Sequence, residues 1–195
     1  MNFEEYLAYF ADILAHPEKH EAYQDENYYT YTKLNHSRTQ RWLSRYQPSA
    51  ELNEMISQIR ESQHWIIITE PWCGDAAHSV PQLYNIAKDN KNIDFEIQLR
   101  DTEPFLIDEY LTNGTKSIPK LIIRNEVGHD LFVWGPRPQP AVEIREKLIA
   151  EGADFEKINQ TLQKWYNEDK GQSLEKNLIN FFNDLTSSEE ETHNN

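Results

Sequence analysis

The sequence predicts an α/β domain in which helices flank a central mixed β-sheet. Three observations carry this prediction. Residues 65–69 are apolar without alternation, which is typical of a strand covered on both faces. Residues 93–99 alternate between apolar and polar side chains, which indicates a strand with one polar face. Several other segments place apolar residues three and four positions apart, which is the spacing of an amphipathic helix.

The region between residues 50 and 151 alternates between helices and strands. In chain order we predict a helix near 50–62, a strand over 65–69, a helix over 74–89, a strand over 93–99, a helix over 104–112, strands over 121–124 and 131–134, and a helix over 140–151. A helix joins the first two strands, so we expect them to be parallel with a right-handed crossover. A short loop containing Gly128 separates the last two strands, so we expect them to be antiparallel.

Helical segments extend this domain at both ends. Residues 2–14 and 35–46 have helical spacing, whereas residues 21–31 are polar and rich in tyrosine and receive no assignment. Helical spacing returns after residue 152, and the polar, acidic end is expected to be disordered. We therefore divide the chain into an N-terminal helical extension (1–49), an α/β domain (50–151), a C-terminal helical extension (152–186) and a tail (187–195).

The composition narrows the class of protein. The chain is 38% hydrophobic, which is enough for a packed core. Its net charge of -14 opposes contact with phosphate backbones and anionic lipid, so we expect neither a nucleic acid nor a membrane as partner. A single cysteine excludes an intramolecular disulfide and a cysteine-rich zinc site, and no residue pattern indicates a metal or a cofactor. We identify no signal peptide and no apolar run near the roughly 18–20 residues that cross a bilayer, so we expect a cytoplasmic protein.

The single cysteine, Cys73, lies where the first predicted strand ends and the next helix begins. The first N–H groups of a helix lack internal partners and the helix dipole is positive there, so both favour a thiolate. Cysteines placed in this way commonly have a pKa lowered to roughly 3.5–7.5. We therefore predict an exposed, reactive thiol. The alternative is that Cys73 is a small apolar residue that closes the strand.

The neighbours of Cys73 have two interpretations each. Trp72 is either an exposed flat wall for a partner segment or a core aromatic, and the sequence does not separate the two. Gly74 lets the backbone turn tightly beside the sulfur. Asp75 can cap the following helix, and its charge disfavours a thiolate next to it. His78 is five residues beyond Cys73, about 500° around a helix, so the two side chains diverge.

Three separated strings then indicate a family. Trp72–Ala76 (WCGDA) resembles the Trp-Cys-Gly-x-Cys site of thioredoxins, Gly114–Pro119 resembles the loop with a cis-proline that faces the active cysteine, and Gly135 matches a glycine after the last strand. The resemblance covers residues 50–151, and the fuller strings look like a bacterial branch of thioredoxin-like proteins. It implies a thioredoxin-like fold with a cis bond before Pro119. It also implies that the backbone of Ile118 pairs with an extended peptide beside Cys73.

Two departures from the family pattern concern activity. Ala76 stands where a dithiol site has its second cysteine, so an external thiol must resolve any mixed disulfide that Cys73 forms. Ile67 stands where many thioredoxins have a buried aspartate that accepts the proton of the second cysteine. Arg100 follows the second strand and Arg137 lies in the turn after the last strand; either could reach the Cys73 edge and stabilise a thiolate, but the sequence does not place their side chains.

Two functions follow. In the first, the protein is a monothiol thioredoxin-like protein in which Cys73 forms mixed disulfides with a small thiol or a protein partner. Trp72, Gly74, Ile118 and Pro119 would then form the substrate contact. In the second, it is a non-catalytic module that keeps the peptide groove and has lost the redox cycle. The retention of Cys73 with Ile118–Pro119 slightly favours the first, and the paired loss of the second cysteine and the buried acid favours the second.

Overall fold

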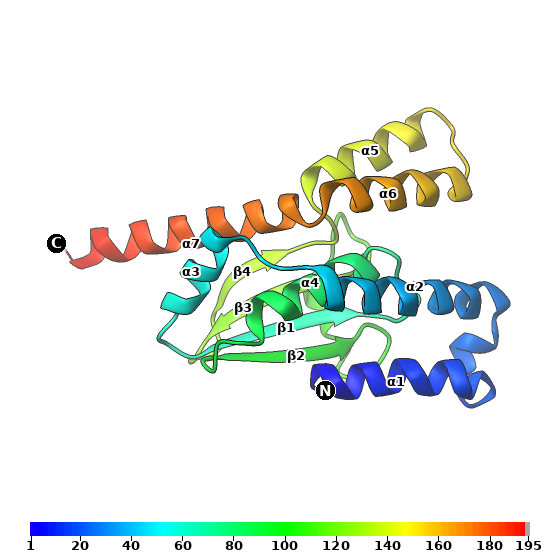
Figure 1. The fold of residues 1–195 in the computed structure, drawn as a ribbon, viewed down its shortest axis with the longest axis horizontal. Helices are drawn as coiled ribbons and strands as arrows, with labels where there is room; N and C mark the ends of the chain where they lie inside the picture. The colour runs from blue at the N-terminus through cyan, green and yellow to red at the C-terminus, as the bar shows by residue number, and fades with distance from the viewer. Residues whose placement is uncertain (194–195) are drawn as a thin grey trace.

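The computed structural model describes the backbone of residues 1–193 and the side chains of residues 1–187. Its sheet contains, in spatial order, β2 (Ile93–Leu99), β1 (Gln63–Thr69), β3 (Lys120–Asn125) and β4 (Asp130–Trp134), as Figure 1 shows. β1 and β2 are parallel, and β3 is antiparallel to both β1 and β4. The mixed sheet with helices around it confirms the predicted fold class and both predicted strand orientations.

Seven α-helices surround the sheet in the described part of the chain. They are α1 (Phe3–Ala15), α2 (Glu26–Arg45), α3 (Ala50–Gln58), α4 (Ala76–Ala87), α5 (Gln139–Ala150), α6 (Phe155–Asp169) and α7 (Gln172–His193). The described residues also form three short 3-10 helices. η1 (Pro17–Lys19) and η2 (Glu21–Gln24) lie between α1 and α2, and η3 (Leu106–Glu109) lies between β2 and β3. α7 includes most of the tail that we predict to be disordered, and residues 194–195 lie outside the described residues.

Two helices differ from the sequence-based expectation. α2 begins nine residues earlier than predicted, at Glu26, where the Asp25 side chain accepts from the backbone N–H groups of Asn27 and Tyr28. The side chains that α2 buries near its middle are mostly polar, so no apolar spacing marks the helix. The helix predicted over 104–112 is wrong, because only η3 forms there and Phe105 before it is left-handed, with φ of 54°.

The two faces of the sheet are covered differently. On one face, aromatic rings of the sheet stack on α7, with Trp65 on Phe182 and Phe132 on Phe181. α4 packs on the same face, and α2 packs on α4 (Figure 1). The opposite face is covered in part by the segment that contains η3, whose Tyr110 accepts a hydrogen bond from Arg124 of β3. The main apolar core therefore lies between the sheet and the helices.

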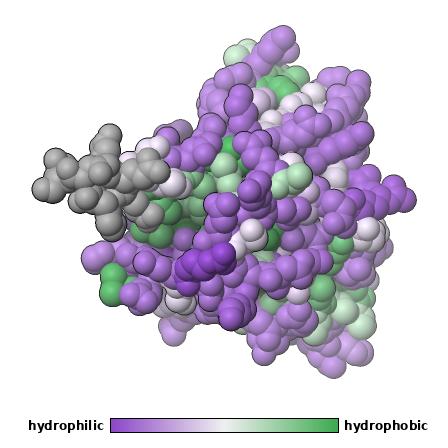
Figure 2. All heavy atoms as spheres, turned by 60° about the vertical axis from the view of Figure 1, so that its left-hand side comes forward, coloured by the Kyte–Doolittle hydropathy of each residue, from purple (hydrophilic) through white to green (hydrophobic). Residues whose placement is uncertain are grey.

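The surface is mainly polar, in keeping with the charge of the chain. Hydrophilic side chains cover most of the face in Figure 2, and the hydrophobic areas between them are small. None of the helices in the described residues is both long and apolar enough to cross a membrane.

Candidate functional site

Cys73 lies in the turn between β1 and α4, and it is buried. Its side chain belongs to the main core, with a relative exposure of 6%. The Sγ atom donates to the carbonyl oxygen of Ile118 at 3.4 Å, so Cys73 is held as a protonated thiol. The predicted exposed thiol is therefore wrong, because the chain adds side chains over this turn that the strand–turn–helix pattern does not reveal.

The electrostatics of Cys73 also differ from the expectation. Burial raises the pKa of the Cys73 thiol to about 12, and the carboxylate of Asp75 raises it as well. The backbone N–H groups of Ala76 and Asp75 and the Arg137 guanidinium act in the opposite direction. The helix N-terminus thus favours the thiolate as predicted, but the loss of hydration outweighs it.

Asp75 does not cap α4. Its backbone is helical and its side chain accepts no hydrogen bond from the first turn. Instead one carboxylate oxygen pairs with the guanidinium of Arg137, and the other accepts from the Tyr166 hydroxyl at 2.8 Å. Arg137 follows β4 and Tyr166 belongs to α6, so a residue of the Cys73 turn joins this turn to the C-terminal helices. Arg137 reaches the site edge, but its direct partner is a carboxylate.

Trp72 is half-buried, and two side chains pack against its indole. The Tyr28 ring stacks on one side at 5.3 Å between centroids, and the Arg100 guanidinium lies 4.6 Å from the ring centroid. Next to it, the Asn35 side chain donates to the carbonyl oxygen of Pro71 at 3.0 Å. Tyr28 and Asn35 both come from α2, so the N-terminal extension covers this side of the turn. Trp72 is therefore not an open wall for a partner.

The loop before β3 faces Cys73. The Ile118–Pro119 peptide is cis, and both residues are buried. Gly135, after β4, adopts φ of 114° and lies against Pro119, where a Cβ atom would collide with the Pro119 carbonyl oxygen. A glycine is therefore required at this position by both backbone conformation and space. Gly74 has open space around its Cα.

The comparisons with known proteins agree with this geometry. A family model described as thioredoxin matches residues 21–151. This chain belongs to the thioredoxin family. The matched region begins within what we treat as the N-terminal extension. A comparison with curated proteins gives no match.

Two solved structures resemble this thioredoxin-family chain. The crystal structure of an HIV epitope-scaffold is 16% identical, with a TM-score of 0.54, and the match covers 79% of this chain and 85% of that one. A protein of unknown function from Pseudomonas aeruginosa is 19% identical, with a TM-score of 0.47 over 73% of this chain and 86% of that one. At this identity the first of these supports the fold alone.

The two positions at which the chain departs from the family pattern are both in the core. Ala76 is 2% exposed and Ile67 is fully buried in β1. No second thiol exists in the sequence. Ile67 gives this part of the sheet an apolar side chain where many thioredoxins have an acid, so no proton acceptor stands at that position.

A buried acid does lie near Cys73, at a position that the sequence analysis missed. Glu70 is 5% exposed and accepts from the Asp101 backbone N–H at 3.1 Å and from the Tyr23 hydroxyl at 3.4 Å. Burial raises the pKa of Glu70 to about 7. Its place directly after an apolar strand, in the Cys73 turn, was the available signal.

His78 is buried and points away from Cys73, toward α2 and α6. Its Nδ1 accepts from the Trp42 indole N–H at 2.8 Å, so the proton is on Nε2, which donates to Gln163 at 3.1 Å. The ring also stacks on Tyr166 with centroids 4.3 Å apart. Burial lowers the pKa of His78 to about 3, so it is neutral at physiological pH. It joins three helices and has no place beside the thiol.

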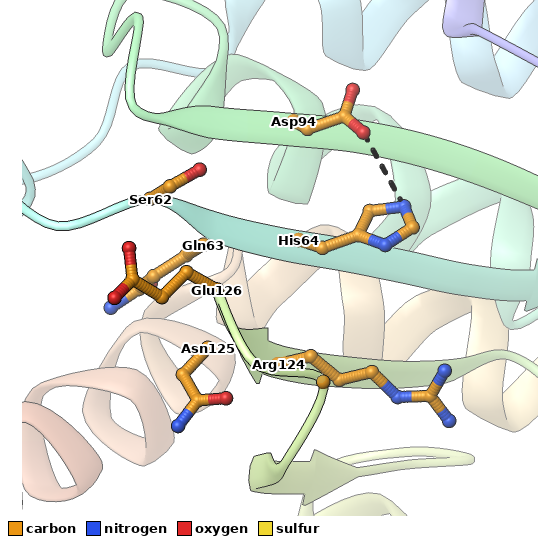
Figure 3. A pocket seen from close by; sticks show the side chains of 8 residues that line it. Ser62, Gln63, His64, Asp94, Arg124, Asn125 and Glu126 are labelled. Atoms are coloured by element: carbon orange, nitrogen blue, oxygen red, sulfur yellow. Dashed lines mark ion pairs between the residues drawn. The ribbon is translucent and has the colours of Figure 1, made fainter.

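A pocket of about 290 Å³ lies at the opposite end of the sheet from Cys73. Figure 3 shows that His64, Asp94 and Arg124, from three neighbouring strands, project to the same side. His64 contacts Asp94 at 3.5 Å and Glu96 at 2.8 Å, and Arg124 pairs with Asp130 at 2.7 Å. These charges are already paired with one another. Among the described residues, no group of three or more histidine, cysteine or acidic side chains is arranged to hold a metal ion.

Proposed function

We propose that this thioredoxin-family chain is a protein-binding module of the bacterial cytoplasm that does not turn over thiols. The observation that carries the proposal is the buried thiol of Cys73, which donates its proton to the Ile118 carbonyl. The thiolate is the form that attacks a disulfide. Because burial raises the pKa of the Cys73 thiol to about 12, little thiolate forms at pH 7, so attack is slow even where a disulfide reaches the sulfur.

The loop that thioredoxins use to hold an extended peptide is kept while the redox residues are not. Ile118 and Pro119 still face the Cys73 turn, and the backbone of Gly135 still packs against Pro119. An extended segment of a protein partner is therefore the ligand that this architecture suits, through backbone pairing at Ile118. The net charge of -14 favours partners without a strong negative charge.

Alkylation of Cys73 in the folded protein, followed from pH 6 to pH 10, tests this proposal. We expect slow modification with no ionisation step below pH 9, and rapid modification once the protein is denatured. Cys73→Ser provides the background rate. Fast alkylation with an apparent pKa below about 7.5 would overturn the proposal and restore the redox function.

A second candidate, a monothiol redox protein, is favoured by one contact. The Sγ atom lies 3.4 Å from the Ile118 carbonyl, so the sulfur already faces the cis-prolyl loop. In this mechanism the Cys73 thiolate attacks a disulfide RS–SR′, forms Cys73–S–SR and releases R′S⁻. A low-molecular-weight thiolate then attacks the mixed disulfide, takes RS as a new disulfide and regenerates the Cys73 thiolate.

Mass spectrometry separates this candidate from the first. Incubation with oxidised glutathione should give a glutathione adduct on the wild-type chain and none on Cys73→Ser if the monothiol mechanism operates. Absence of the adduct from the folded wild-type chain, together with its formation after denaturation, would exclude it. Ala76→Cys extends the test: a folded variant that reduces disulfides would show that the site geometry still supports thiol chemistry.

A further inference from the structure

The helices α5 and α6 form a hairpin with an apolar cluster of its own. Ala141 of α5 packs with Ile158, Leu162 and Tyr166, which lie four residues apart along α6. This cluster is separate from the main core between the sheet and α4. In Figure 1 the hairpin lies beside the body of the molecule rather than on the sheet. The two helices are therefore held to each other by apolar contact and can be treated as one unit.

A second stripe of α6 holds the hairpin to the body, and its side chains are amides. Asn159 donates to the Tyr31 hydroxyl at 3.3 Å, and Asn167 accepts from Arg41 at 2.6 Å. Between them, Gln163 contacts His78 at 3.1 Å. We call this row of three contacts the polar seam. Contacts between parts of a chain that are polar rather than apolar are typical of parts that move relative to each other.

The seam ends next to Cys73, at the two contacts of Asp75. Both partners of this carboxylate belong to the hairpin or to the turn that leads into it: Tyr166 on α6 and Arg137 before α5. Burial raises the pKa of Tyr166 and the Asp75 carboxylate raises it further, so the hydroxyl stays protonated and donates to Asp75. The contacts that fix the hairpin thus include Asp75, a residue of the Cys73 turn that lies two positions from the thiol.

Two short backbone segments connect the hairpin to the rest of the chain. Residues 135–138 lead from β4 into α5, and Gly135 there has φ of 114°. Lys170 and Gly171 connect α6 to α7, and both have positive φ, at 55° and 88°. Changes in a few such terminal positions are enough to turn a helical unit as a rigid body.

We propose that the α5–α6 hairpin is a lid that closes over the Cys73 turn and opens as a unit, through residues 135–138 and 170–171. In the closed form, Asp75 holds the lid through Tyr166 and Arg137, and the polar seam holds it along α2 and α4. Opening breaks hydrogen bonds, an ion pair and the stacking of Tyr166 on His78, and leaves the apolar contacts within the hairpin intact. It uncovers Cys73 and the neighbouring Ile118–Pro119 loop. The proposal rests on the proposed function, since this loop is the expected site for the partner.

Hydrogen exchange and Cys73 alkylation on the full chain test the lid. In the wild type, we expect the amides of α5 and α6 to exchange together and faster than those of β1 and β3. The double variant Gln163→Ala and Tyr166→Phe removes one seam contact and one contact to Asp75. We expect it to raise the alkylation rate and the exchange of the hairpin about tenfold or more, since each lost hydrogen bond is worth roughly fivefold.

Gln160→Ala is the matched control. Gln160 is exposed on the same helix and bonds only within it, to Glu156, so its loss should change neither rate. An unchanged alkylation rate and unchanged exchange in the folded double variant would overturn the lid. So would exchange of the hairpin together with β1 and β3 in the wild type, a result that needs no variant. The proposed function fails on a different result, a low apparent pKa of Cys73 in the wild type.

Discussion

The sheet-facing core and the α5–α6 hairpin bury apolar side chains in the same way, but they are joined to their surroundings differently. In the core, Trp65 stacks on Phe182 and Phe132 on Phe181 across the sheet–helix interface. The hairpin meets the body through the polar seam and through Asp75. Apolar contact is non-directional, whereas hydrogen bonds depend on individual partners. The fold therefore rests on the core, and the covering of Cys73 rests on a few named side chains.

The largest expected effect comes from replacing one leucine in each region by alanine. Leu121 is fully buried in β3, and Leu121→Ala should lower the free energy of unfolding by about 2–5 kcal/mol. Leu162→Ala should lower it less, because it loosens the hairpin while the core remains folded. Denaturant unfolding measures the first effect and hydrogen exchange of α5 and α6 measures the second. Equal global losses from the two variants would show that the hairpin and the core unfold as one.

The two glycines beside the candidate site should respond very differently to alanine. At Gly135 a Cβ meets the Pro119 carbonyl oxygen and φ is 114°, so Gly135→Ala should cost about 3 kcal/mol of stability. Gly74 has open space, and Gly74→Ala should stay within about 0.5 kcal/mol. Thermal unfolding of both variants measures this. A small loss at Gly135 would mean that the turn after β4, where the lid begins, does not depend on the contact with Pro119.

The fold was predictable because its determinants are local and apolar. The apolar strand at 65–69, the alternation at 93–99 and the loop at Gly128 fix the order and directions of the strands. The start of α2 could not be predicted in the same way. Its buried side chains include Thr32, Asn35 and Thr39, which are polar and therefore leave no apolar pattern in the sequence.

The sequence predicts where the candidate site lies but not that its thiol is buried. The strings around Cys73, Pro119 and Gly135 do meet at one end of the sheet. The burial of Cys73 depends on contacts far along the chain, such as Tyr166 with Asp75 and Asn35 with Pro71. Nothing in the spacing of a single motif reports such partners, so the expectation of an exposed thiol was reasonable from local geometry and wrong in the folded protein.

The buried carboxyl of Glu70 should make the stability of the protein depend on pH. Burial raises the pKa of its carboxyl from 4.5 to about 7. The contribution of this carboxyl to folding stability is therefore fully present below pH 4.5 and is lost as pH rises through 7. Glu70→Gln keeps an acceptor for the Asp101 N–H and removes the charge. Relative to wild type, we expect this variant to gain stability between pH 4.5 and pH 8, by on the order of 2 kcal/mol.

The measurement is the free energy of unfolding of both proteins across this pH range. Glu126→Gln, which changes an exposed carboxylate in the loop before β4, is the control and should follow the wild type at every pH. A constant difference between Glu70→Gln and wild type would mean that Glu70 is hydrated in solution, and that η2 covers it less tightly than the contact of Tyr23 indicates.

The smallest expected effect concerns Trp72, at the side of the turn that α2 covers. Arg100→Ala removes the guanidinium from the indole, a contact worth about 0.5–1 kcal/mol, and leaves the stacking of Tyr28 on Trp72 in place. The ion pair of Arg100 with the exposed Asp101 adds little. We expect a loss of roughly 1 kcal/mol and increased quenching of tryptophan fluorescence by acrylamide. Arg60→Ala, at an exposed arginine bonded only to the Ser57 carbonyl, should change neither. Unchanged quenching in Arg100→Ala would mean that Trp72 is already open to solvent, which would favour the first of its two sequence-based interpretations, an exposed flat surface for a partner.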